Sequence, residues 1–202
     1  MKSYFKKEMA LLLTLLALTA GCGREAPPAE EGKIPVAVSF GAMEKLTEAI
    51  GGDAVSISVM VPEGIEPHDF EPRAGDLIRL KQARVFVYNG MGMEHWADKA
   101  LQSAGAENQV VVRASEKVVP IPLEDEEERE EHGDYDPHTW LGLSEAKEEA
   151  RAIRDGLIAA SPENRDLFMK NYDTFAKSID SLQQEYREKL AKAPRKELVT
   201  GH

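Results

Sequence analysis

Cysteine is almost absent from this chain, because Cys22 is the only one among 202 residues. No disulfide can therefore form within the chain, and a packed core must provide its stability. Positive charge is also scarce: 25 lysines and arginines stand against 36 aspartates and glutamates, which gives a formal net charge of −11 at pH 7. Nucleic-acid binding needs clusters of lysine and arginine against the phosphates, and no such cluster is visible, so no nucleic-acid partner is expected.

The chain also lacks an apolar run long enough to span a bilayer. The run at residues 9–20 has about 12 residues, whereas a transmembrane helix needs ~20. Lys2, Lys6 and Lys7 precede this run, so residues 1–21 are predicted to be a secretory signal peptide. Its removal would leave 181 residues with a formal net charge of −13, because the segment carries three lysines and one glutamate.

Small residues lead directly into the single cysteine, in the segment LTAGC (residues 18–22). This segment resembles a bacterial lipobox with cleavage before Cys22. Alternatively, Cys22 is an incidental residue of an ordinary signal peptide, but an unpaired exposed thiol is unfavourable in an exported protein. We therefore expect a lipid on Cys22 that anchors the chain to the extracytoplasmic face of the cell membrane. Residues 22–33 are rich in Gly, Pro, Ala and Glu, which predicts a flexible tether.

Strand and helix signals alternate over residues 34–112, which predicts an α/β fold. Four segments rich in β-branched and aromatic residues are predicted strands, at residues 34–40, 54–61, 84–88 and 109–112. Helices are expected between them, at residues 43–50, 75–82 and 95–103. This order predicts a parallel sheet covered on both faces by helices, with ligand-binding loops at the carboxyl ends of its strands.

The rest of the chain is predicted to be mainly helical. Ser144 is expected to cap one helix, whose apolar residues recur every three or four positions from Ala150 to Ile158. Ser161 and Pro162 are expected to begin a second helix that runs to Ala193, about 30 residues or ~45 Å long. Residues 197–200 then read as the beginning of a further strand.

Residues 124–134 lie between the α/β region and the mainly helical region, and they hold eight acidic residues. Self-repulsion is expected to keep this segment as an extended loop. Two interpretations stay open. The segment is a solvated insertion without a role, or it is a metal-collecting loop in which His132, Glu126, Glu127 and Glu128 raise the local concentration of cations.

Three of the five histidines suggest a metal site: His68 in EPHDFEP (residues 66–72), His138 in DPHTW (residues 136–140), and His202 at the end of the sequence. Neutral imidazole is a common zinc ligand, and the first two histidines stand in turns braced by proline and flanked by acidic residues. A lone exposed histidine is usually only solvated, so the hypothesis depends on the set.

Three neighbouring positions have structural interpretations. Asn89-Gly90 is expected to form a turn after a strand. Glu94 suits the dipole at the start of a helix, and it fits such a structural role about as well as a functional one. His95 is expected at the surface.

Several stretches together carry a resemblance to one family: residues 66–72, 76–77, 87–96, 136–141, 171–172 and 199–202. Over residues 34–202 the chain resembles the zinc- and manganese-binding solute-binding lipoproteins of bacterial ABC transporters (cluster A-I, ZnuA/TroA-like). That family also includes streptococcal proteins first described as adhesins.

The resemblance implies two α/β lobes joined by one long helix, with the metal ion between them. Residues 34–142 would form the N-terminal lobe, residues 143–194 a helical segment with the linking helix, and residues 195–202 the start of a C-terminal lobe of which the chain holds only the first strand. His68 and His138 would be ligands from the first lobe and His202 the ligand that opens the second. The family's fourth ligand, a late acidic residue, has no counterpart in these 202 residues.

The resemblance also implies a function. Histidine rather than glutamate at the third ligand position favours Zn²⁺ over Mn²⁺, because imidazole is softer than carboxylate. The protein would capture the ion and pass it to the permease of an ABC importer, and would not be an enzyme. A surface adhesin remains an alternative. So does a zinc hydrolase, although only Glu66, Asp69, Glu71 and Asp136 offer a general base and no His-Glu-x-x-His motif is present.

The lipid anchor gives a first prediction. Replacing the cysteine in a Cys22→Ser variant should release the protein from the membrane fraction, because the serine hydroxyl cannot accept the thioether-linked lipid. Fractionation of cells that express the two forms measures this. Continued tight membrane association of the variant would contradict the anchor.

Overall fold

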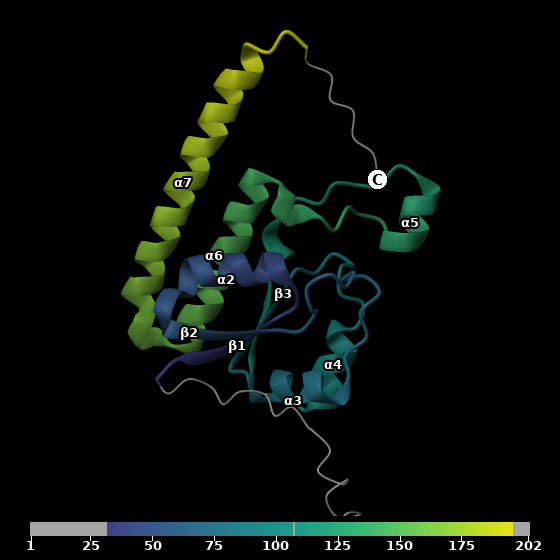
Figure 1. Ribbon diagram of the computed structural model, residues 1–202, viewed down its shortest axis with the longest axis vertical. Helices are drawn as coiled ribbons and strands as arrows, with labels where there is room; N and C mark the ends of the chain where they lie inside the picture. The colour runs from purple at the N-terminus through teal and green to yellow at the C-terminus, as the bar shows by residue number, and fades with distance from the viewer. Residues whose placement is uncertain (1–31, 107, 196–202) are drawn as a thin grey trace, which may run out of the picture.

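Four parallel strands form one sheet at the centre of the molecule (Figure 1). The structure is a computed structural model that describes residues 32–106 and 108–195. Its strands are β1 (Ile34–Val38), β2 (Val55–Val59), β3 (Val85–Tyr88) and β4 (Val110–Arg113), in the spatial order β2-β1-β3-β4. Val38 pairs with Val59 on one side and with Val87 on the other. The parallel sheet predicted from the sequence is therefore confirmed.

Helices cover both faces of this sheet, which explains the apolar character of the central strands. One face carries α2 (Gly41–Gly51), followed by the 3₁₀ turn η1 (Gly52–Ala54), and α6 (Leu143–Ala160). The other face carries α3 (Ala74–Gln82) and α4 (Ala97–Ala104). All four residues of β3 are buried, and Val36, Ala37 and Val38 of β1 are buried too.

The strand order places a topological switch between β1 and β3. The chain runs from β1 outward to β2, then crosses back to β3 and continues outward to β4. The connections that leave β1 and β3 therefore lead to opposite faces of the sheet. Such a divergence opens a crevice at the carboxyl ends of the strands, where open α/β sheets bind ligands.

The helix α6 begins at a different residue from the one predicted. Gly142 occupies the N-cap position, directly after the 3₁₀ turn η3 (Thr139–Leu141), and accepts the Ala146 N–H at 2.8 Å. The Ser144 hydroxyl instead accepts a hydrogen bond from Gln183 Nε2 at 3.0 Å. The prediction that Ser144 caps the helix was wrong, because the preceding turn leads into the helix two residues earlier.

The long helix α7 (Arg165–Ala191) has 27 residues and packs on the lobe mainly through its first half. Ser161 and Pro162 lead into a 3₁₀ turn, η4 (Pro162–Asn164), rather than into α7 itself. Phe168 is fully buried, and Asn171 Nδ2 donates to the Ile50 carbonyl oxygen at 2.9 Å.

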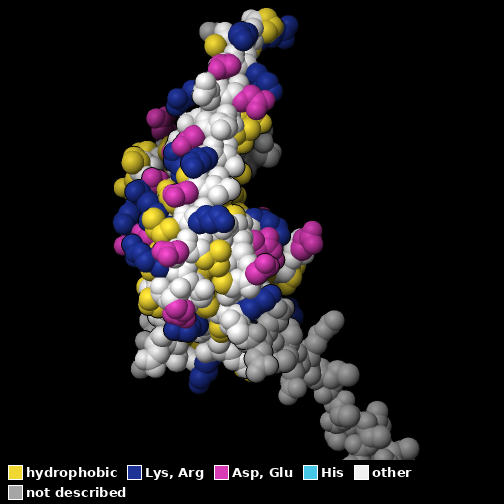
Figure 2. All heavy atoms as spheres, turned by 90° about the vertical axis from the view of Figure 1, so that its left-hand side faces the viewer, with side chains coloured by type: hydrophobic (Ala, Val, Ile, Leu, Met, Phe, Trp, Pro, Cys, Tyr) yellow, Lys and Arg dark blue, Asp and Glu magenta, His cyan; other side chains and the backbone are white. Residues whose placement is uncertain are grey.

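The second half of α7 extends past the lobe. Its apolar residues become exposed there, with Tyr186 50% and Leu190 64% accessible. Figure 2 shows this side of the molecule, where acidic and basic side chains are interspersed along the helix.

The acidic segment contains a helix, so the prediction of an extended loop was wrong. Glu126–His132 form α5, and the Asp125 carboxylate caps it by accepting the N–H groups of Glu127 and Glu128 at 2.9 and 3.2 Å. Carboxylates in a first helical turn interact favourably with the helix dipole. These local interactions offset the mutual repulsion on which the prediction relied.

Three predicted features lie outside the described residues: the signal peptide, most of the tether with Cys22, and the strand at residues 197–200. The 3₁₀ turn η2 (Ala114–Lys117) completes the elements that are described. Across residues 32–106 and 108–195, no helix has both the length and the apolar character that a membrane span requires.

The packing of α7 gives a prediction about stability. Phe168→Ala should lower the free energy of unfolding by about 3–5 kcal/mol, because it leaves a cavity where α7 meets the lobe. Leu190→Ala, at an exposed position on the same helix, should change it by less than about 0.5 kcal/mol. Urea unfolding of both variants measures the difference. Equal effects would show that Phe168 does not anchor the helix.

Candidate metal centre

The loops that carry His68 and His138 meet at the carboxyl end of the sheet. His68 lies in the connection after β2, and His138 directly precedes η3. Their imidazole centroids are 5.6 Å apart, with the ring planes at 69°. An ion bound at ~2.0–2.1 Å to one nitrogen of each ring, with a tetrahedral angle between them, would place the centroids roughly 5 Å apart. The two rings thus have a separation that suits two ligands of one ion.

Asp136 fixes the orientation of His138. Its Oδ1 atom lies 2.8 Å from His138 Nδ1 and also accepts the His138 backbone N–H at 2.9 Å. When Nδ1 carries the proton toward this carboxylate, Nε2 becomes the electron-pair donor of the neutral ring. Carboxylate–imidazole pairs of this kind orient metal-binding histidines and increase their basicity.

The other predicted site residues are only partly described. His202, like Cys22, lies outside the described residues. Within residues 32–106 and 108–195, no three His, Cys, Asp or Glu side chains form a group that could hold a metal ion. The described part of the site is therefore a pair of histidines. His95 is exposed, as predicted, and lines the same open cavity of about 580 Å³ as His68.

The predicted metal-collecting residues stand on α5. Glu126 and Glu127 are exposed and Glu128 is half-buried. A short antiparallel ladder connects this helix to the site: Leu123 N–H donates to the Asp134 carbonyl at 3.0 Å and Asp136 N–H to the Ile121 carbonyl at 2.9 Å. The ladder therefore places the base of the acidic helix directly beside Asp136, the residue that orients His138.

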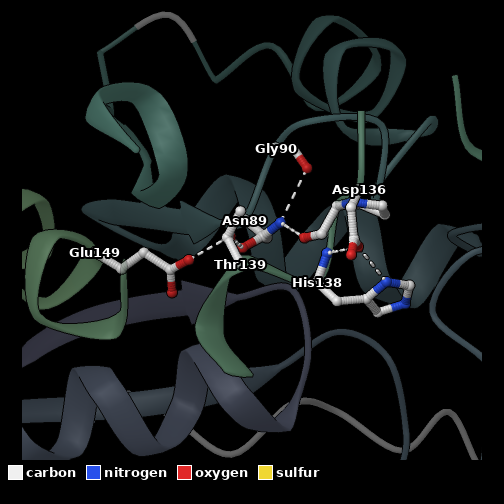
Figure 3. A network of polar contacts seen from close by, with 7 residues as sticks. Asn89, Gly90, Asp136, His138, Thr139 and Glu149 are labelled. Carbon is white, nitrogen blue, oxygen red and sulfur yellow. Dashed lines mark hydrogen bonds and ion pairs between the residues drawn. The ribbon is translucent and has the colours of Figure 1, made fainter. Parts of the chain in front are cut away.

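A network of buried polar groups lies behind the His138 loop (Figure 3). Its centre is Asn89, which is fully buried at the end of β3. Asn89 Nδ2 donates to the carbonyl oxygens of Pro137 at 2.8 Å and Gly90 at 3.0 Å. Its Oδ1 atom lies 3.0 Å from the Thr139 hydroxyl. One side chain thus contacts the residues on both sides of His138.

Glu94 anchors the turn that carries Asn89. Its two carboxylate oxygens accept the backbone N–H groups of Asn89 and Gly90 at 2.8 and 2.9 Å. Burial raises the pKa of Glu94, and these N–H donors oppose that shift. Gly90 has a φ of +91°, and a side chain there would collide with Arg113, so the turn requires glycine.

Glu149 completes the network from α6. Its side chain is fully buried, with Oε1 2.5 Å from the Thr139 hydroxyl, while Oε2 has no hydrogen-bond partner among the described residues. The pKa of Glu149 is raised to about 7, chiefly by burial. The carboxylates of Glu94 and Glu145 act in the same direction, and the hydrogen bond with Thr139 acts against it.

Sequence reasoning missed this network. It assigned Asn89 to a turn and Glu94 to a helix dipole, and it did not single out Glu149. One signal was available: Glu149 lies three residues after Ala146 and four before Ile153, within the buried stripe of α6. A carboxylate on an apolar helix face indicates a buried polar contact.

Comparisons with known proteins agree with this fold. Residues 36–202 match the family model described as ZnuA, zinc-uptake complex component A periplasmic. The chain belongs to this family. Membership confirms the resemblance seen in the sequence and the prediction of a binding protein rather than an enzyme.

Individual relatives cover nearly the whole chain. It is 31% identical to a putative metal-binding protein of Treponema pallidum over 96% of its length, and 30% identical to the zinc-binding lipoprotein AdcA of Streptococcus pneumoniae over 98%. It spans 65% of the first relative and 40% of the second. A manganese ABC transporter substrate-binding lipoprotein, PsaA of Streptococcus anginosus, is 31% identical over 96% of the chain and 64% of its own length.

A solved structure shows the same fold. The crystal structure of Zn(II)-bound AdcA from Streptococcus pneumoniae superposes with a TM-score of 0.71 at 28% identity, over 81% of this chain and 34% of that chain.

The buried carboxyl of Glu149 gives a prediction about stability and pH. Its pKa is about 7 in the folded chain and near the ordinary 4.5 when unfolded, so between these pH values the folded state binds more protons. Stability should therefore fall as the pH rises from 4.5 to 7. This loss is absent in Glu149→Gln. As the pH rises from 4.5 to 8, the free energy of unfolding of the variant should therefore increase by about 3 kcal/mol relative to that of the parent chain.

Urea unfolding across this pH range measures the gain. Glu188→Gln, at an exposed position of α7, serves as the control and should differ from the parent by the same small amount at every pH. A parallel pH dependence for the parent and Glu149→Gln would contradict the raised pKa of Glu149.

Proposed function

We propose that this chain captures a divalent metal ion outside the cytoplasm, zinc in preference to manganese, and delivers it to the permease of an ABC importer. The observation that carries the proposal is the meeting of His68 and His138, whose ring centroids lie 5.6 Å apart. Membership of the zinc-uptake family supports the same conclusion. The ion is cargo in this function, so binding and release replace chemistry on a substrate.

The pair of histidines supports a preference for zinc. Imidazole nitrogen suits zinc, whereas manganese sites favour oxygen ligands. His138 would bind through Nε2, because Asp136 holds its Nδ1 side at 2.8 Å. His202 would supply a third nitrogen. Each coordination position without a protein ligand would be filled by water, which weakens the binding of the ion.

The charge of the chain supports rapid capture. Its formal net charge is −11, and the exposed carboxylates of Glu126 and Glu127 stand on the helix that joins the chain beside Asp136. Such a field raises the local concentration of cations and therefore the association rate. In this proposal α5, with His132 and Glu128, collects metal ions without ligating the ion at the histidine pair.

The position of the chain in the cell follows from Cys22 in this proposal. A lipid on this residue would hold the protein at the extracytoplasmic face of the membrane, within reach of the permease. Residues 22–33 would serve as the tether.

Calorimetric titration of the purified chain with zinc tests the site. His68→Ala and His138→Ala should each remove most of the binding, because each variant loses a ligand. Asp136→Ala should weaken binding about 10- to 100-fold, because it keeps the ligand and loses its orientation. The control is His95→Ala, at an exposed histidine, which should bind like the parent.

Three results would argue against this proposal or a part of it. Tight zinc binding that survives the loss of His68 would exclude the site. Tighter binding of manganese than of zinc in the same titration would reverse the metal preference. Attachment to host surfaces that is unaffected by a metal chelator would favour the adhesin alternative.

A further inference from the structure

The Thr139 hydroxyl stands between two oxygen atoms and has only one proton to donate. It lies 3.0 Å from Asn89 Oδ1 and 2.5 Å from Glu149 Oε1 (Figure 3). The Asn89 amide is oriented with its oxygen toward Thr139, because Nδ2 donates to the carbonyls of Pro137 and Gly90. An amide oxygen cannot donate. Both short contacts of Thr139 are therefore hydrogen bonds only when Glu149 supplies the second proton.

A neutral Glu149 gives a chain of donors that runs in one direction. The Glu149 carboxylic acid donates to Thr139 Oγ1, the Thr139 hydroxyl donates to Asn89 Oδ1, and Asn89 Nδ2 donates to the Pro137 carbonyl. Each bond in such a chain polarises the next and strengthens it. This series of hydrogen bonds ends at Pro137, one residue before His138.

The surroundings of Glu149 favour its neutral form. The side chain is fully buried, and its Oε2 atom has no hydrogen-bond partner among the described residues, which is more costly for a carboxylate than for an acid. Among the described residues, the charged group outside α6 that acts most on Glu149 is the carboxylate of Glu94, in the segment after β3. The helix itself contributes Glu145. Both groups are acidic, and burial with their charge raises the pKa of Glu149 to about 7.

We propose that Glu149 is a proton-dependent positioning residue for the His138 loop: its acid form holds Thr139 and Asn89 in the arrangement that fixes Pro137. When Glu149 ionises, the Thr139 hydroxyl turns to the carboxylate, and Asn89 Oδ1 is left buried without its donor. Loss of that bond loosens the loop and the orientation of His138. The inference rests on the proposed role of His138 as a metal ligand.

Zinc titration at several pH values tests the effect on binding. Glu149→Gln keeps the shape of the side chain and offers an amide N–H to Thr139 at every pH, so it mimics the acid form. The dissociation constant of the parent chain should equal that of the variant at pH 6 and exceed it about fivefold to tenfold at pH 8, the effect of one buried hydrogen bond. The ratio of the two dissociation constants is used because protonation of the imidazoles affects both proteins alike and cancels in it.

A second substitution tests the route through Thr139. In a Thr139→Val background the hydroxyl is absent, so adding Glu149→Gln should no longer change the pH dependence of zinc binding. Glu188→Gln, at an exposed position of α7, should give a ratio near one at both pH values. A ratio for Glu149→Gln that is constant from pH 6 to pH 8 would overturn the inference, since a residue that only packs would give that result.

A spectroscopic measurement on the zinc-free chain separates this inference from the proposed function. The carboxyl ¹³C resonance of Glu149 should titrate near pH 7, and the side-chain NH₂ resonances of Asn89 should move with the same midpoint. Both changes should be absent in Glu149→Gln. If these resonances move together while neither the parent chain nor any variant binds zinc, the positioning role stands and the proposed function fails. If zinc binds but the Asn89 resonances do not follow Glu149, the positioning role fails.

Discussion

The side chain of Asn89 holds together the two segments on which the candidate site depends. It lies at the carboxyl end of β3 and donates to Pro137, 48 residues further along the chain. The Thr139–Glu149 hydrogen bond and a short ladder beside α5 also hold the segment around His138. A buried amide whose donors and acceptor are all bonded specifies one arrangement, because any other would leave polar atoms without partners in the protein interior. Asn89 therefore transfers the rigidity of the sheet to a loop outside it.

The sheet topology explains why these segments meet. The connections after β1 and β3 diverge to opposite faces, and the crevice between them receives the turn at Asn89 and the segment from η3. His68 enters from the loop after β2, the strand next to β1. Two histidines that are distant in sequence become neighbours because the loop after β2 and the segment that Asn89 holds meet at the carboxyl end of the sheet. The fold itself thus supplies the geometry of the pair, and local hydrogen bonds refine it.

The sequence predicted the features that local patterns determine. Segments rich in β-branched and aromatic residues predicted all four strands, and the turns braced by proline singled out His68 and His138 as candidate ligands. The errors have different causes. Self-repulsion suggested an extended acidic loop, but the Asp125 cap favours a helix. Glu149 interacts with Thr139 and Glu94, which come close to it only in the folded chain, and no periodicity in the sequence reports such a contact.

The two histidines are held to different degrees, and this difference bears on the proposed capture and release of an ion. Asp136 and the buried network fix His138 from behind, so little of the binding free energy is needed to order it. His68 follows a loop whose first residues, 62–66, are exposed. An exposed loop can move at low cost, whereas the network around Glu149 cannot change without leaving a buried polar atom unsatisfied. Movement of the His68 side would therefore open the pair first, while His138 keeps its place on the lobe.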